Sequence, residues 1–357
     1  MEGKVMHVKR ILALLLTGVI LLSLAACGGG GGGTPAPAGT GSAPAPAGTN
    51  ATAPSEKTHL VFADVGWDSI LFHNAVAGLI AEEVFGYTWE EMSGSTPLTH
   101  EALLGGEIDV HMEVWTDNLP TYKADLAAGK LKELSLNFGD NIQGLYVPRY
   151  VIEGDAARGI AAVAPDLKTV KDLANYPELF PDHEDPGMGV IYGGPPGWEV
   201  TVILENKWKV YGLDAMYNYE SPGNDAILAA AMVGAFDRGE PIVAYYWSPT
   251  WLLGLYDFVL LEDEPYDEAT FQDGLCAFPS VQVMICASND FYASNPDYCA
   301  FLSKYQTSSP LTNEALAHIQ DTGDSYPQTA RWFLGQHPEL VDEWLTADQA
   351  EMLRAAL

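Results

Sequence analysis

Short apolar runs bounded by glycine, proline or polar residues alternate with stretches of helical periodicity from about residue 58 to the end of the chain. Four of these runs lead into a tryptophan, at Trp67, Trp115, Trp198 and Trp247. Runs of this length, rich in β-branched residues, are typical of buried strands. Strands that alternate with helices predict an α/β fold in which helices pack over mostly parallel sheets.

The individual elements follow from this alternation. The expected strands cover 60–66, 108–114, 142–148, 189–192, 216–219, 241–246 and 280–287. The expected helices cover 68–84, 96–105, 170–173, 199–211 and 225–236. From residue 295 to the end the pattern is mostly helical, and Pro310, Pro327 and Pro338 mark helix starts because proline fits the first helical turn.

The positions of the four tryptophans predict a binding site. In open α/β sheets, ligands bind in the crevice outside the carboxyl ends of the strands. Each tryptophan stands where a predicted strand ends, so several large aromatic faces are expected to meet in one cleft. The alternative is that each tryptophan only closes a core strand as a large apolar residue.

The first residues indicate export. Basic residues precede an apolar stretch, 11–22, that is too short to span a bilayer and has the layout of a secretory signal. The residues that end at Cys27 resemble the lipobox of bacterial lipoproteins, which implies a signal peptide of residues 1–26 and a lipidated Cys27. Residues 27–57 then form a flexible linker rich in Gly, Pro, Ala and Thr. We expect an extracytoplasmic protein attached to the bacterial cell membrane by its lipid only; the alternative is a free secreted protein in which Cys27 is incidental.

Charge and cysteine content exclude other classes of partner. The chain has 48 acidic and 17 basic residues, which excludes a nucleic-acid partner because phosphate binding relies on clusters of Lys and Arg. The three cysteines after Cys27, namely Cys276, Cys286 and Cys299, have wide spacing without histidines and do not resemble a zinc site. Buried free thiols are favoured over a bridge between Cys276 and Cys286.

Four motifs resemble one known family. They are Val65-Gly66-Trp67-Asp68 and the segments 105–110 (Gly-Gly-Glu-Ile-Asp-Val), 195–199 (Pro-Pro-Gly-Trp-Glu) and 239–249 (Gly-Glu-Pro-Ile-Val-Ala-Tyr-Tyr-Trp-Ser-Pro). With them, the chain from about Leu60 to its end is similar to the substrate-binding proteins of ABC importers for glycine betaine, proline betaine and related quaternary amines.

The resemblance implies a type II periplasmic-binding-protein fold, in which two α/β lobes are joined by a hinge of two strands. Lobe 1 is then formed by 58–143 and 263–357, and lobe 2 by 144–262. The resemblance further implies a quaternary amine as ligand and a membrane permease as partner, with neither a cofactor nor catalysis.

The chemistry of tryptophan fits such a ligand. A quaternary ammonium has no hydrogen to donate, whereas the negative face of an indole attracts it electrostatically. By resemblance, Trp67, Trp198 and Trp247 form a cage, with Trp115 at the edge of the cleft. The helix predicted to begin after Trp198 offers unpaired N–H groups, so the amides of Glu199 and Val200 are candidate donors to a ligand carboxylate.

The identity of the amine stays open. Some relatives place a carboxylate-binding histidine soon after a cage tryptophan. Here the nearest is His73, two positions later than the resemblance predicts, so His73 is a candidate contact for which packing or exposure is favoured. Asp68, Ser69 or Glu113 could instead contact a different head group. Glycine betaine, choline, carnitine and dimethylsulfoniopropionate all fit these residues.

Two other classes compete. An extracellular glycoside hydrolase or carbohydrate-binding protein could use tryptophan platforms with carboxylates such as Glu113, Asp117 and Glu199. A binding protein for sugars or amino acids on the same scaffold would use more Asn, Asp and Arg contacts. The arginines of the middle segment do not adjoin the tryptophans, which disfavours a clamp for an amino-acid carboxylate.

Overall fold

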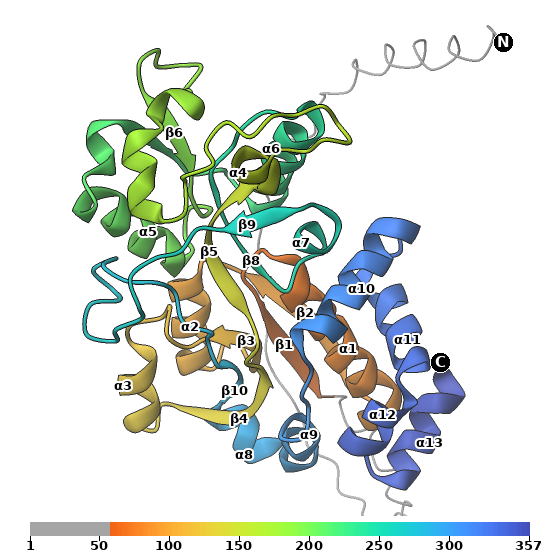
Figure 1. Ribbon diagram of the computed structural model, residues 1–357. Coiled ribbons are helices and arrows are strands. Elements are labelled where there is room, and N and C mark those ends of the chain that lie inside the picture. Colours follow the sequence, from red (N-terminus) through yellow and green to blue (C-terminus); the bar gives the residue numbers. More distant parts are fainter. Residues whose placement is uncertain (1–57) are drawn as a thin grey trace, which may run out of the picture. The chain divides into compact units, whose positions relative to one another are not determined.

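The computed structural model describes residues 58–357. The signal peptide, the lipidated Cys27 and the linker expected from the sequence lie outside the described residues. Within them, the chain forms two lobes, each built on a five-stranded sheet flanked by helices (Figure 1).

The first lobe contains a sheet with the strand order β2-β1-β3-β10-β4. Its strands are β1 (His59–Asp64), β2 (Thr88–Ser93), β3 (Val110–Trp115), β4 (Leu131–Phe138) and β10 (Val283–Ser288). Its helices are α1 (Asp68–Phe85), α2 (Thr96–Gly105), α3 (Tyr122–Ala127), α8 (Asn289–Ser294), α9 (Pro296–Leu302), α10 (Ser309–Thr322), α11 (Tyr326–Gln336), α12 (Pro338–Trp344) and α13 (Ala347–Ala356).

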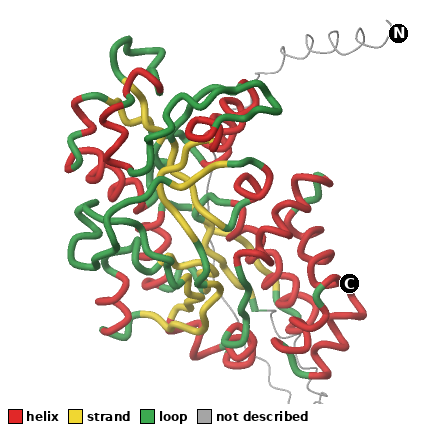
Figure 2. Tube along the Cα trace, in the orientation of Figure 1, coloured by secondary structure: helices red, strands yellow, loops and turns green. Residues whose placement is uncertain are grey.

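The second lobe contains a sheet with the strand order β7-β6-β8-β5-β9. Its strands are β5 (Ile142–Pro148), β6 (Gly189–Tyr192), β7 (Tyr217–Glu220), β8 (Ala244–Ser248) and β9 (Phe258–Leu260). Its helices are α4 (Arg149–Glu153), α5 (Glu199–Val210), α6 (Asp225–Arg238) and α7 (Trp251–Leu255), with the 3₁₀ turns η1 (Val170–Asn175), η2 (Pro177–Leu179) and η3 (Leu213–Ala215). Figure 2 shows that long loops join these elements.

Both sheets are mixed, so the expectation of mostly parallel sheets is wrong. In each sheet two neighbouring pairs are parallel and two are antiparallel. The antiparallel pairs all involve β10 in the first sheet and β5 in the second. These are the strands by which the chain enters a sheet from the other lobe, without the crossover helix that a parallel neighbour requires.

The chain passes between the sheets twice. Residues 139–141 connect β4 to β5, and the long segment 261–282 connects β9 back to β10. Part of that segment packs on α5, where the buried Lys207 ammonium donates to Asp263 at 2.5 Å and to the carbonyl of Cys276 at 2.7 Å. The lobe boundaries expected at 143/144 and 262/263 stay predictions.

The core of the first lobe holds α1 between the sheet and the C-terminal helices. Phe72 of α1 meets Phe333 of α11 edge to face, with ring centroids 5.1 Å apart. The helix ends at Gly86, whose φ of 70° is a conformation that favours glycine. Fixing α1 in this way fixes its first residues, which follow directly after Trp67.

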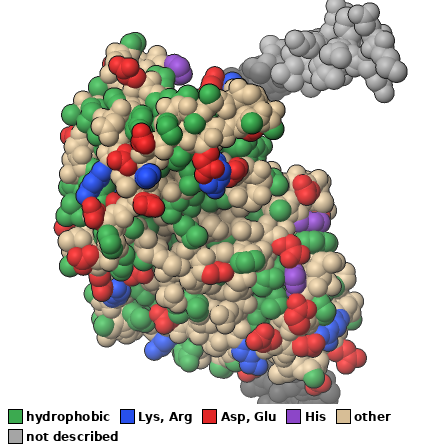
Figure 3. Space-filling model, viewed as in Figure 1, with side chains coloured by type: hydrophobic (Ala, Val, Ile, Leu, Met, Phe, Trp, Pro, Cys, Tyr) green, Lys and Arg blue, Asp and Glu red, His purple; other side chains and the backbone are tan. Residues whose placement is uncertain are grey.

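Other sequence expectations can be checked directly. The helices expected at 68–84, 96–105 and 225–236 are confirmed as α1, α2 and α6, whereas the helix at 170–173 is a 3₁₀ turn. Cys276, Cys286 and Cys299 are buried free thiols, as expected. On the face shown in Figure 3, acidic side chains are scattered over both lobes. None of the helices within 58–357 has the length and apolar character needed to cross a membrane.

Candidate functional site

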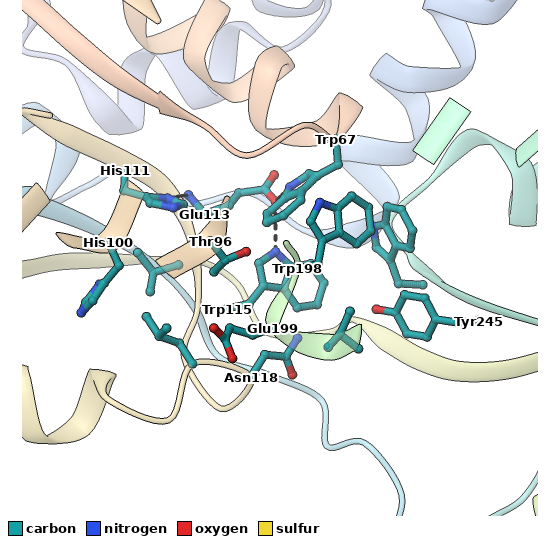
Figure 4. Close-up of a pocket in the computed structure, with 14 residues that line it drawn as sticks. Trp67, Thr96, His100, His111, Glu113, Trp115, Asn118, Trp198, Glu199 and Tyr245 are labelled. Carbon is teal, nitrogen blue, oxygen red and sulfur yellow. Dashed lines mark hydrogen bonds between the residues drawn. The ribbon is translucent and has the colours of Figure 1, made fainter. Parts of the chain in front are cut away.

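The structure brings the four tryptophans that follow predicted strands into one cavity between the lobes (Figure 4). The first lobe contributes Trp67, Thr96, His100, His111, Glu113, Val114, Trp115, Asn118 and Leu119. The second lobe contributes Trp198, Glu199, Val200, Tyr245 and Trp247. The space among these side chains, including its opening to solvent, is about 550 Å³.

The strand topology explains why these residues meet. Strands β1 and β3 are parallel neighbours, so Trp67, just after β1, and Trp115, at the end of β3, lie at the same edge of the first sheet. Strands β6 and β8 are likewise parallel. Trp198 lies in the segment after β6, and Trp247 lies at the end of β8. The two edges face each other, and the cavity lies between them.

Three of the tryptophans pack at nearly right angles. The ring of Trp198 lies edge to face with Trp67 at a centroid distance of 5.2 Å and with Trp247 at 5.0 Å. Tyr245 stacks on Trp247 at 5.9 Å. The four tryptophans are only 4–8 % exposed. The two centroid distances from Trp198 are those of aromatic rings in direct edge-to-face contact, and the negative face of an indole attracts a cation.

Trp198 also joins the lobes by polar contacts. Its indole Nε1–H donates to the carbonyl oxygen of Val65 in the first lobe at 3.0 Å. Next to it, the backbone N–H of Thr96 donates to the carbonyl of Gly197 at 3.0 Å. The position of this ring therefore depends on both lobes.

Glu113 lies behind two of the indoles. Its Oε2 accepts hydrogen bonds from Trp67 Nε1 at 2.7 Å, from Ser69 Oγ at 3.1 Å and from Trp115 Nε1 at 3.3 Å. Figure 4 shows the carboxylate between Trp67 and Trp115. The side chain is fully buried, and burial raises the pKa of Glu113 to about 7 despite these three donors. Its Oε1 receives no hydrogen bond from any residue in 58–357.

His73 does not line the cavity. It is buried in the core of the first lobe, where its Nδ1 pairs with Tyr305 Oη at 2.8 Å and its Nε2 lies 3.4 Å from Thr312 Oγ1. Burial lowers the pKa of His73 to about 3, so the ring is neutral near pH 7. Its Nε2 is 3.6 Å from Glu113 Oε1, and a neutral ring at that distance does not form an ion pair.

Among residues 58–357, no lysine or arginine lines the cavity. Of the two histidines that do, His100 pairs with Asp125 at 3.0 Å, while burial and the nearby His100 lower the pKa of His111 to about 3. The half-buried Glu199 has its pKa raised by burial. The walls therefore offer aromatic faces and two carboxyl groups, without a permanent positive charge to receive an anion.

The start of α5 is the part of the lining that can receive an anion. Trp198 is its N-cap residue, and no side chain caps the helix. Within the described residues, the backbone N–H groups of Glu199 and Val200 donate no hydrogen bond to the protein. The first N–H groups of a helix are available to an acceptor on a ligand.

Several lining residues were not predicted from the sequence, whereas Glu113 and the four tryptophans were among its candidates. On β3, His111, Glu113 and Trp115 stand two residues apart, as do Tyr245 and Trp247 on β8. Because side chains of a strand alternate between faces, counting back by two from each tryptophan identifies these partners. Thr96, His100 and Asn118 carry no comparable signal in the sequence. No group of three or more His, Cys, Asp or Glu side chains within 58–357 is arranged to hold a metal ion.

Comparison with known proteins places the chain among binding proteins. A family model described as the substrate binding domain of ABC-type glycine betaine transport systems matches residues 58–336. The glycine betaine/L-proline-binding protein ProX from Borrelia burgdorferi is 19% identical, with 83% of this chain and 100% of that chain covered and a TM-score of 0.66.

Two further solved structures are similar. An ABC-transporter choline-binding protein, solved in complex with choline, is 23% identical over 85% of this chain and 99% of that chain, with a TM-score of 0.64. Lactococcal OpuAC, in its closed conformation with glycine betaine, is 20% identical over 81% of this chain and 99% of that chain, with a TM-score of 0.61. At these identities the likeness confirms the fold expected from the sequence, a type II periplasmic-binding-protein fold.

Proposed function

Because the chain belongs to the family of substrate-binding domains of ABC-type glycine betaine transport systems, we propose that it captures a quaternary ammonium compound, such as glycine betaine or choline. It then delivers this compound to the membrane permease of an ABC importer. The ammonium group occupies the cage of Trp67, Trp198 and Trp247, with Trp115 beside Trp67.

The observation that supports this proposal most is the perpendicular packing of three buried indoles at one cavity, to which the described part of the chain contributes no lysine or arginine. A cation over an indole face gains roughly 0.5–2 kcal/mol. Three such faces contribute about 1.5–6 kcal/mol, whereas a micromolar dissociation constant needs about 8 kcal/mol.

The remainder is supplied at the polar end of the ligand. The unpaired N–H groups of Glu199 and Val200 are the donors available to a ligand carboxylate or hydroxyl. His73 has no part in this proposal, since its side chain bonds to Tyr305 outside the cavity.

We further propose that lipid on Cys27 holds the protein at the outer side of the cell membrane. The support is the sequence around Cys27. An extracellular carbohydrate-binding protein or glycoside hydrolase is not favoured, because the family is one of transport rather than catalysis. In addition, three donors already occupy one oxygen of the buried Glu113.

A thermal-shift screen of the purified protein tests the proposal. We expect glycine betaine or choline to raise the melting temperature, and sugars and free amino acids to leave it unchanged. A shift with sugars alone, or release of product from a glycoside, would replace the proposal by the carbohydrate alternative.

A further inference from the structure

We propose that Glu113 is the buried counter-charge of the site, which acts through the indoles of Trp67 and Trp115 and biases the cage toward ligands with a net positive charge. The inference rests on the proposed function, because it assumes that the cavity holds a quaternary ammonium group. It concerns the choice among such ligands.

The geometry shows why Glu113 acts through other side chains. Its side chain is 0% exposed although it lines the cavity, and its Oε2 accepts from the N–H groups of the two indoles, Trp67 and Trp115. An acceptor with negative charge polarises the N–H groups that it holds, and hydrogen bonds in series polarise one another. Electron density in the Trp67 and Trp115 rings therefore increases, which strengthens the attraction of their faces for a cation.

A merely structural role does not account for the residue type. Holding the N–H groups of Trp67 and Trp115 and the hydroxyl of Ser69 requires only an acceptor, which a neutral amide oxygen also provides. Burying a carboxylate costs more than burying an amide unless its charge is compensated. Glu113 has no cationic partner among residues 58–357: His73, at 3.6 Å, is neutral, and Oε1 accepts no hydrogen bond.

A bound cation supplies the missing compensation. Choline carries one positive charge and no negative one, so it gains the full attraction. Glycine betaine carries both, and its carboxylate is repelled by the charge that attracts its ammonium. No lysine or arginine within 58–357 lines the cavity, so the ligand carboxylate meets only the uncharged N–H groups at the start of α5, which do not supply a positive charge to offset this difference.

The other titratable groups around Glu113 are accounted for. His73 on α1 and His111 on β3 have their pKa lowered to about 3, and burial raises the pKa of Tyr305 well above its ordinary value, so all three are neutral near pH 7. In the cavity itself, His100 and Glu199 remain. Both side chains are retained when Glu113 is substituted. Any effect of their titration on ligand binding is therefore also present in the Glu113 variant, which serves as the control for it.

The test is isothermal titration of the wild-type protein and the Glu113→Gln variant with choline and with glycine betaine. Glutamine keeps the size and an acceptor but removes the charge. We expect choline affinity to fall about tenfold or more in the variant and glycine betaine affinity to fall clearly less. As a matched control, Glu133→Gln, which loses a carboxylate that accepts from Tyr122 outside the cavity, should change neither affinity.

The pH profile of the wild-type protein tests the inference without relying on a variant. Below about pH 7 Glu113 takes up a proton, so choline affinity should fall as the pH is lowered from 8 to 6, and the ratio of choline to glycine betaine affinity should fall with it. In Glu113→Gln this ratio should be constant. Equal losses for both ligands, or a ratio that is independent of pH in the wild type, would overturn the inference while leaving the proposed function intact. Failure of both ligands to bind the wild type would refute the proposed function itself.

Discussion

Replacing Trp198 by alanine removes the side chain that contacts both other members of the cage. The ring lies 5.2 Å from Trp67 and 5.0 Å from Trp247, and it is 8% exposed. Loss of one desolvated face costs about 2 kcal/mol of cation–π attraction. Loss of the contact with Val65 in the other lobe, where Trp198 donates at 3.0 Å, adds about 1 kcal/mol. We therefore expect the dissociation constant to rise about a hundredfold.

The Trp198→Phe variant separates the cation–π attraction from the hydrogen bond to Val65. Phenylalanine retains an aromatic face but has no N–H group to donate to Val65, so its loss should be about tenfold. Isothermal titration with glycine betaine or choline measures both variants. The control is Trp208→Ala on the same helix, because Trp208 also donates its indole N–H to a backbone carbonyl, that of Tyr217, but does not line the cavity.

One result for the two Trp198 variants would contradict the cage. If Trp198→Ala and Trp198→Phe showed equal and small losses, similar to those of Trp208→Ala, Trp198 would be a packing residue at the lobe boundary. The cage would then have to be rejected.

The remaining predictions concern pH, anchoring and motion. Glu113 has a pKa of about 7 in the folded protein and 4.5 ordinarily, so its contribution to the stability of the ligand-free protein should fall by about 3 kcal/mol as the pH rises from 4.5 to above 7. The free energies of unfolding in urea of the wild type and of Glu113→Gln should diverge over that range in favour of the variant. A difference between the two proteins that does not change with pH would contradict this prediction. Cys27→Ser should move the protein from the membrane fraction to the soluble fraction, whereas persistence at the membrane would argue against a lipid anchor. Saturating ligand should reduce the radius of gyration measured by X-ray scattering, because the contacts of Trp198 with Val65 and of Gly197 with Thr96 join the lobes; an unchanged radius would indicate a preformed, rigid pocket.

Much of the fold could be predicted because its elements carry strong local signals. The helix α1 has apolar residues at helical spacing and a glycine at its end, and the buried strands that lead to Trp115 and Trp247 consist mostly of apolar and aromatic residues. The strand β2 was missed because it lies at the edge of its sheet and is largely exposed, so its sequence contains few apolar residues. The direction of β5 and β10 was also missed, since it depends on how the chain passes between lobes rather than on local pattern.

Some residues of the site could also be predicted from local sequence signals, whereas others depend on tertiary packing. Trp67, Trp198 and Trp247 could be predicted because each marks the end of a strand or the start of a helix, and such ends meet at one edge of a sheet. The role of Glu113 could not be predicted in this form. Its effect depends on the three side chains that donate to it and on its complete burial, and these depend on tertiary packing.

The central claim is that the cage recognises positive charge, and one comparison tests it most directly. Choline and its carbon analogue, in which a tert-butyl group replaces the trimethylammonium, have nearly the same shape but differ in charge. Titrated into the same wild-type protein, choline should bind at least about tenfold more tightly, since each of the three indole faces contributes roughly 0.5–2 kcal/mol to a cation only. Equal affinities for the two compounds would show that the cavity recognises shape and apolar surface, and would contradict the claim that the tryptophan cage recognises positive charge.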